Sequence, residues 1–301
     1  MSKPFLALIC LPLLMGAACD KGAKKSGDTG AINALDRAGS EGQTGPIDET
    51  PMQGIDVSKL SAEKQKLFYK LAGSLSSPCG KAHSLRTSFT QDTACKRAPF
   101  AVRYVAALLE DEGSEAMARE EYDKKYKDAK TVKIDFAKAP RVGNDDAPIR
   151  LVEFFDYQCP HCQQFAPVLE AVAAANEGKV VEYFMMFPLE KHENSRSAAQ
   201  AAVAAAQFGK FKEMHRMLFA RSPQHSKSAV MSYAKELGID AAQFEAAYNA
   251  AAAQVAHDLA QGDTAGVEAT PTLYFNDRKY EGPLHPKYLT MWIDEELAVN
   301  R

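Results

Sequence analysis

The feature that most constrains this chain is a pair of cysteines, Cys159 and Cys162, placed directly after a dense apolar run. Residues 149–155 (IRLVEFF) suit a strand that is buried on both faces, and residues 165–175 suit a helix. Two cysteines three positions apart at the start of such a helix can form a disulfide and open to a dithiol with little movement. This context predicts a redox-active pair in an α/β protein.

The position of Cys159 at a helix N-terminus predicts its chemistry. Unpaired backbone N–H groups and the helix dipole favour negative charge there, so we expect a stabilised thiolate. His161, between the two cysteines, can add positive charge or a hydrogen bond to that thiolate. A stabilised thiolate stabilises the reduced protein and makes the disulfide form a stronger oxidant. The motif therefore favours a protein that donates its disulfide.

The first twenty residues indicate export. An apolar segment, residues 5–15, is followed by small residues up to Cys19. This segment is too short to span a bilayer stably, so we interpret residues 1–18 as a signal peptide. A cysteine after small residues resembles the bacterial lipoprotein signal, which implies that Cys19 is lipidated and anchors the protein on the periplasmic side of the envelope. Asp20 resembles a signal for retention at the inner membrane.

Composition sets the domain organisation and excludes one class of partner. The 301 residues carry a net charge of −3 and no basic stripe, so we expect no nucleic acid. Residues 19–56 contain few large apolar side chains and are expected to form a flexible tether. The sequence pattern predicts a small helical domain over residues 57–130 and a second domain over residues 131–301. We expect neither a cofactor nor a resident metal.

The helical domain is expected to contain three helices and a disulfide. Helices are predicted after the capping residue Ser61, at Asp92 and after Ser114. Cys79 and Cys95 enclose 15 residues, and in an oxidising compartment a bridge over that length contributes roughly 3 kcal/mol. Two other interpretations stay open: a relay of electrons to Cys159, and a metal site that includes His83.

The order of the remaining segments predicts the fold of the second domain. A helical region spans about 194–261, and the turn Asn276-Asp277 predicts a hairpin. The order β-β-α-β, helical insert, β-β-α is that of a thioredoxin fold with an inserted helical subdomain. The expected strands are 132–136, 149–155, 180–187, 272–275 and 278–280, and the last helix begins at Pro286.

The sequence Cys159-Pro160-His161-Cys162 resembles the motif of the DsbA-type periplasmic thiol:disulfide oxidoreductases. The similarity covers most of residues 140–295, including a lead-in at 141–148 and a helical segment at 211–219. It implies that Cys159 is the exposed nucleophile and that Cys162 is the buried resolving thiol. It also implies that Pro160 and His161 belong to the catalytic motif.

Two further sites are implied by the same resemblance. Glu153, six residues before Cys159, matches a buried acid that assists proton transfer to and from Cys162, although a lone acid can also be exposed at a sheet edge. Thr270-Pro271 matches a cis-proline loop whose backbone pairs with the substrate chain.

The resemblance leaves the direction of the reaction open. It implies reduced or unfolded exported proteins as substrates, and a membrane partner similar to DsbB or another quinone-linked enzyme. Thr270, however, resembles the isomerase branch of DsbC and DsbG, so an isomerase, or a reductase fed by a membrane electron donor, is the alternative. A hypothesis of another class is a non-enzymatic metal-binding envelope protein or metallochaperone that uses Cys159 and Cys162 as ligands.

Overall fold

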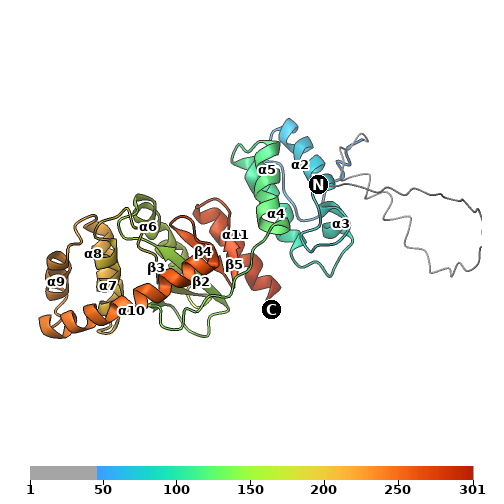
Figure 1. Cartoon of the computed structure of the whole chain (residues 1–301). Helices are drawn as coiled ribbons and strands as arrows, with labels where there is room; N and C mark the ends of the chain where they lie inside the picture. Colours follow the sequence, from blue (N-terminus) through green and yellow to red (C-terminus); the bar gives the residue numbers. More distant parts are fainter. Residues whose placement is uncertain (1–45, 301) are drawn as a thin grey trace, which may run out of the picture.

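The computed structural model describes residues 46–300. The predicted signal peptide, the lipidation site Cys19 and most of the predicted tether lie outside the described residues. Within residues 46–300, no helix combines the length and the apolar character needed to cross a membrane. Figure 1 shows a group of helices at the N-terminal end of this part, next to a larger body that contains the sheet.

The N-terminal helices follow the predicted capping residues in two of three cases. Ser61 and Ser114 each accept a backbone N–H bond at the start of a helix. The helix predicted to begin at Asp92 begins at Ala98 instead. The Asp92 carboxylate accepts a hydrogen bond from the Ala94 N–H, which holds a turn ahead of the helix. The elements are α2 (Ala62–Ser74), α3 (Leu85–Thr90), α4 (Ala98–Glu110), α5 (Glu115–Tyr122) and the π-helix η1 (Asp123–Lys127).

A five-stranded sheet in the order β1-β3-β2-β4-β5 forms the centre of the larger body. Strands β2 and β3 are parallel, and the other neighbours are antiparallel. The sheet, with α6 and α11 packed against it, is the predicted thioredoxin fold. Its elements are β1 (Arg141–Val142), β2 (Ile149–Phe155), α6 (Pro160–Ala175), β3 (Val180–Met186), β4 (Thr272–Phe275), β5 (Arg278–Tyr280) and α11 (Pro286–Val299).

One predicted strand, residues 132–136, is wrong. Only Thr131 forms a bridge, with Arg278, and the edge position beside β3 belongs to β1 instead. Ile134 packs against Val152 and Tyr274, on one face of the sheet. The apolar residues of this segment therefore cover the sheet and do not extend it.

Four helices form the insert between β3 and β4, and all four pack into the largest core cluster. Small alanine side chains let α7 and α10 approach closely beside the sheet, as Figure 1 shows. The helices are α7 (Ser195–Ala206), α8 (Phe211–Ala220), α9 (Lys227–Glu236) and α10 (Ala241–Ala265).

The two faces of the sheet pack against different helices. Along β2, Ile149 and Leu151 join a core with residues of α6 and α11. Val152 and Phe154 join a core that includes Ala265 of α10. Because successive side chains of a strand alternate in direction, Glu153 lies on the face of Leu151, below α6.

The N-terminal helices contact the larger body through buried charges on α11. Glu295 is 1% exposed and accepts bonds from Arg97 Nη1 at 2.5 Å, Lys125 Nζ at 2.9 Å and the Tyr126 hydroxyl at 2.9 Å. Glu296, 2% exposed, pairs with Arg97 and Arg278. These contacts join α4 and η1 to α11.

Candidate active site

The two cysteines of the motif lie where β2 leads into α6. β2 ends at Phe155, and Cys159 is the N-cap residue of α6, with Pro160 in the first helical position. Both sulfurs are free thiols. Cys159 is 6% exposed and Cys162 is fully buried. The first thiol therefore lies at the helix N-terminus near the surface, and the second lies one turn deeper.

The loop of Thr270-Pro271 packs directly against the first thiol. The peptide bond between these two residues is cis, and the Thr270 carbonyl oxygen accepts a hydrogen bond from Cys159 Sγ at 3.4 Å. Pro271 is partly exposed beside it. The structure thus brings together the motif and a backbone segment more than a hundred residues later.

Exposed side chains flank the first thiol on its helical side. Pro160 and His161 are both exposed at the start of α6. His161 is therefore available to an incoming chain, while Cys162 is covered. This difference in exposure separates an accessible side of the motif from a protected one.

Cys162 is held as a protonated thiol by its surroundings. Burial raises its pKa well above the ordinary value, and the nearby Glu153 carboxyl raises it further. The Asp156 backbone and the Thr270 hydroxyl act in the opposite direction. Within residues 46–300 the Thr270 Oγ1 atom has no hydrogen-bond partner, so this hydroxyl is free to donate to a thiolate.

Glu153 is buried in the central strand. It is 2% exposed, and its Oε1 atom has no hydrogen-bond partner among the residues that the structure describes. β2 has β3 on one side and β4 on the other, which excludes the alternative of an edge-exposed acid. Burial raises the pKa of Glu153 well above its ordinary value, and Glu182 of β3 raises it further. Its surroundings therefore favour the protonated form of Glu153.

Glu182 is a second buried acid that the sequence interpretation did not identify. It is 4% exposed, and in the described part of the chain its Oε1 atom also has no hydrogen-bond partner. An acidic residue within the apolar run VVEYFMM was the available signal, of the same kind as Glu153 in IRLVEFF.

Asp156 holds the turn that carries Cys159, and it was also missed. Its buried carboxylate accepts the Gln158 N–H at 2.7 Å, the Leu189 N–H at 2.9 Å and the Ser195 hydroxyl at 2.5 Å. It also lies 2.7 Å from His192 Nδ1. Because most of these partners lie in residues 189–195, which lead into α7, Asp156 fixes the active-site turn relative to the insert.

Glutamine side chains attach the motif to the helical insert. Gln158 donates to the Pro223 carbonyl at 2.7 Å and accepts from the Asn194 N–H at 3.0 Å. Gln163 donates to the Phe219 carbonyl at 2.9 Å. The insert therefore forms one wall beside Cys159.

His215 belongs to the aromatic core of that wall. Its Nδ1 atom lies 2.9 Å from the Tyr157 hydroxyl. Burial lowers its pKa to about 3, so its ring is neutral at neutral pH. His215 is therefore a packing residue and not a source of positive charge for the thiols.

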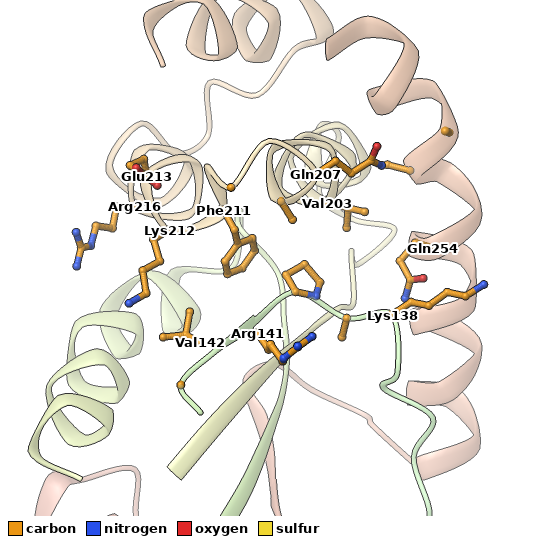
Figure 2. A pocket seen from close by; sticks show the side chains of 17 residues that line it. Lys138, Arg141, Val142, Val203, Gln207, Phe211, Lys212, Glu213, Arg216 and Gln254 are labelled. Atoms are coloured by element: carbon orange, nitrogen blue, oxygen red, sulfur yellow. The ribbon is translucent and has the colours of Figure 1, made fainter. Parts of the chain in front are cut away.

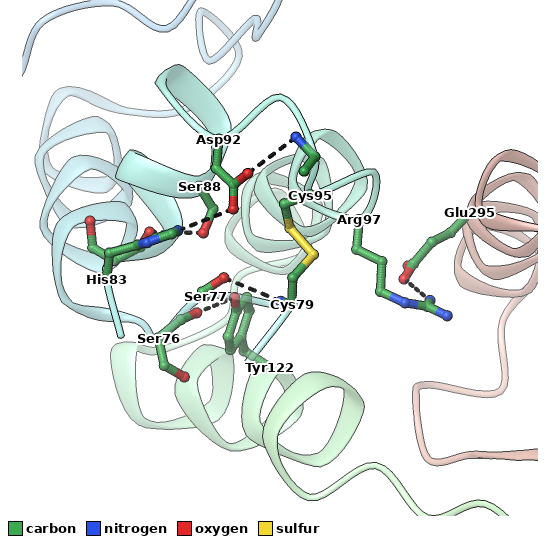
Figure 3. Close-up of a disulfide and its surroundings, with 12 residues drawn as sticks. Ser76, Ser77, Cys79, His83, Ser88, Asp92, Cys95, Arg97, Tyr122 and Glu295 are labelled. Carbon is green, nitrogen blue, oxygen red and sulfur yellow. Dashed lines mark hydrogen bonds and ion pairs between the residues drawn. A yellow bond between two sulfur atoms is a disulfide. The ribbon is translucent and has the colours of Figure 1, made fainter. Parts of the chain in front are cut away.

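Cys79 and Cys95 form a disulfide, shown in Figure 3, that joins the segment before α3 to the segment before α4. His83 lies away from the sulfurs and pairs with Asp92 at 3.6 Å. Because the two sulfurs are bonded to each other, they are not ligands of a metal ion in this structure. Across residues 46–300, no three His, Cys, Asp or Glu side chains are grouped as a metal site.

Two neighbouring cavities lie beside the sheet, away from the exposed surface of the motif. The larger, about 1030 Å³, lies between residues 138–143, α7, α8 and α10, and Figure 2 shows Lys138, Arg141 and Lys212 around it. The second, about 790 Å³, is lined by Glu153 and Glu182. Neither cysteine of the motif lines either cavity.

Comparisons with known proteins match the larger body. A family model described as thioredoxin matches residues 137–295, more than half of the chain. BdbD of Bacillus subtilis in its oxidised form is 26% identical, with a TM-score of 0.51 over 56% of this chain and 98% of that protein. A thioredoxin-like oxidoreductase of Silicibacter pomeroyi DSS-3 is 29% identical, with a TM-score of 0.49 over 53% of this chain and 93% of that one.

Curated relatives match about half of this chain and are much longer. A protein named Na(+)/H(+) antiporter NhaA 1, of Mycobacterium sp. (strain KMS), is 34% identical over 146 residues. The match covers 47% of this chain and only 24% of that protein. This chain thus spans about a quarter of the length of the curated relatives it matches.

Proposed function

Because this chain belongs to the thioredoxin family and its matched region is a thiol:disulfide oxidoreductase domain of the DsbA type, we propose that it donates the Cys159–Cys162 disulfide to other proteins. One observation carries the proposal. The near-surface thiol of Cys159 faces the Thr270 carbonyl at 3.4 Å, while Cys162 lies buried behind it. Cys159 is thus placed to meet the substrate sulfur, and Cys162 is placed to resolve the mixed disulfide while shielded from solvent.

The exchange proceeds in two steps. A substrate thiolate attacks Cys159 Sγ, the Cys159–Cys162 bond breaks, and its electron pair passes to the Cys162 sulfur, which takes a proton from Glu153. A second substrate thiolate then attacks the substrate sulfur of the mixed disulfide. Cys159 leaves as a thiolate, stabilised by the N-terminus of α6. The substrate is oxidised and the protein is reduced by two electrons.

The segment around Pro271 forms the substrate groove in this proposal. Thr270 and Pro271 lie beside Cys159, and the exposed Pro160 and His161 border the same surface. An extended substrate chain pairs with the backbone next to Pro271, which brings its thiol to Cys159. Pro160, His161 and Pro271 therefore touch the substrate, while Glu153 acts on Cys162.

Thr270 favours a second candidate, disulfide isomerisation or reduction. Its free hydroxyl lies next to Cys162, where it favours a thiolate on the resolving sulfur. A resolving thiol that ionises more readily releases mixed disulfides in the reducing direction. The two candidates differ in the reduction potential they require.

The test combines an assay of substrate oxidation with a measurement of the reduction potential of the Cys159–Cys162 pair. The purified oxidised protein is mixed with a reduced, unfolded protein, and disulfide formation is followed beside the Cys159→Ser variant. We expect oxidation by the wild type and none by the variant, and equal activity of the two would contradict the proposal. A potential close to that of thioredoxin, about −270 mV, would identify a reductase.

The partners and location of the protein are part of the proposal. We place it on the periplasmic side of a bacterial envelope, anchored by a lipid on Cys19. Its substrates are exported proteins, and its oxidant is a quinone-linked membrane enzyme.

Residues 57–130 form a separate helical domain whose Cys79–Cys95 bridge is structural. Labelling with a radioactive fatty acid, lost in Cys19→Ala, tests the anchor.

A further inference from the structure

Glu153 and Glu182 lie on neighbouring strands and face the same side of the sheet. The parallel register pairs Leu151 with Glu182 and Glu153 with Phe184, so the two acids are diagonal neighbours. Side chains two positions apart on a strand share a face. Both carboxyls are more than nine-tenths buried, and each has an Oε1 atom without a hydrogen-bond partner within residues 46–300. Two unsatisfied acids therefore lie side by side below α6.

These two acids line one cavity of about 790 Å³ between the sheet, α6 and α8. Lys212 and Arg216 border both this cavity and the larger one of Figure 2. The cavity therefore extends from the buried carboxyls to the charged surface of α8. The other titratable or charged groups that face it are Glu170 of α6, Glu177 after α6, and Lys212, His215 and Arg216 of α8.

Burial and mutual repulsion keep protons on the pair. Burial, and to a smaller extent the charge of Glu170, raise the pKa of Glu182 to about 8 against the opposing charge of Lys212. Burial, then the neighbouring Glu182, raises the pKa of Glu153. Two close carboxyls in a medium of low dielectric constant resist double ionisation. Ionisation of Glu182 thus holds the proton of Glu153 in place.

We propose that Glu182 is a positioning residue that keeps Glu153 protonated and reloads it from the cavity, so that Cys162 exchanges its proton with solvent through two carboxyl groups. The inference deepens the proposed function, on which it rests. Glu182 acts only through Glu153, since it lines the cavity and does not contact the reacting sulfurs.

The proton balance is as follows. When the disulfide opens, the Cys162 sulfur receives the electron pair of the broken bond and the proton of Glu153. The Glu153 carboxylate then takes the proton of Glu182, and Glu182 is reprotonated from the cavity. On reoxidation each transfer runs in reverse, and one proton leaves through the cavity. When the protein oxidises a substrate, the oxidant is its own Cys159–Cys162 disulfide, and on reoxidation the two electrons pass to the oxidising partner of the proposed function.

The test is the pH dependence of disulfide reduction by dithiothreitol in the full chain. For the ratio of wild-type to Glu182→Gln rates, we expect a value near 1 at pH 6 and a rise of at least about fivefold by pH 9, because Glu153 without its charged neighbour ionises earlier. Glu182→Asp should restore the wild-type profile. Glu177→Gln, an exposed acid at the rim of the same cavity, should leave it unchanged.

A ratio that is constant with pH would overturn the inference, because a merely structural role lowers the rate equally at all pH values. The same applies if Glu177→Gln reproduces the effect. A second readout does not depend on the variant rates: the infrared difference spectrum between oxidised and reduced wild-type protein. We expect a carboxylic acid C=O band that Glu182→Gln removes, and an unaltered spectrum would also overturn the inference.

The outcome is separable from that of the proposed function. Dithiothreitol reduces the protein whether or not its natural role is oxidation, so the pH profile tests Glu182 alone. Oxidation of a reduced protein by the wild type, compared with Cys159→Ser, tests the function alone.

Discussion

The Cys159 sulfur donates a hydrogen bond to the Thr270 carbonyl oxygen across 3.4 Å, although the two residues are 111 positions apart in the chain. The same threonine presents its free hydroxyl to Cys162. One residue thus contacts the attacking thiol through its backbone and the resolving thiol through its side chain. Its two groups can be tested separately, because a substitution changes only the hydroxyl.

Replacement of Thr270 by valine should slow release of a mixed disulfide through Cys162. The hydroxyl lowers the pKa of a thiol whose pKa burial raises, so its loss disfavours the attacking thiolate. A hydrogen bond to a charged sulfur of about 1.4 kcal/mol corresponds to a tenfold slower step. Stopped-flow measurement on a preformed mixed disulfide gives the rate.

Thr272→Val is the matched control, because the Thr272 hydroxyl donates to the Ala269 carbonyl and not to a sulfur. The control should keep the wild-type rate. A similar slowing in both variants would show that the Thr270 hydroxyl has no particular role.

Replacement of Glu295 by glutamine should strongly destabilise the contact between α4, η1 and α11. Burial acts to raise the pKa of Glu295, but the charges of Lys125, Arg97 and Arg278 outweigh it and lower the pKa. Removing one partner leaves buried positive charge uncompensated, which costs about 3–5 kcal/mol. Urea denaturation measures the loss.

The control for that variant is Glu120→Gln. Glu120 also pairs with a lysine, Lys124, at 2.7 Å, but its side chain is 65% exposed. Exposed pairs contribute less than about 1 kcal/mol. Equal losses in the two variants would mean that the buried cluster does not stabilise the fold.

The stability gained by Glu182→Gln should increase with pH. Glu182 ionises near pH 4.5 when unfolded and at about 8 when folded. Between these values the folded state binds the extra proton, so this carboxyl makes the wild type less stable as pH rises. The variant lacks the effect and should gain a few kcal/mol relative to wild type between pH 4.5 and 8.5. Denaturation at both pH values checks the sign, and a difference that does not change with pH would refute it.

The double variant Cys79→Ala/Cys95→Ala should lose stability and keep its redox activity. A bridge over this loop contributes about 3 kcal/mol in the chain-entropy model. It joins the segments before α3 and before α4, whereas Cys159 and Cys162 belong to the core of the insert. Turnover with a reduced substrate, measured below the unfolding transition, should match the wild type. A collapse of turnover in a folded variant would favour the relay instead.

Local patterns determined much of this protein. The apolar run ending at Phe155, the motif and the following helix were predictable, as were the hairpin around Asn276-Asp277 and the caps at Ser61 and Ser114. Strand alternation, turn residues and caps act within a few residues, so their signals are present in a short window of sequence.

Only the tertiary structure decided which distant groups meet. The residues 132–136 have the composition of a strand, yet they cover a sheet face, because the edge beside β3 pairs with β1. Glu182 lies diagonally beside Glu153 because of the register between two strands about thirty residues apart. Asp156 accepts hydrogen bonds from Leu189 and Ser195, which only the fold brings close to it. Burial and register set the protonation of these acids, and neither is encoded in the neighbours of a residue along the chain.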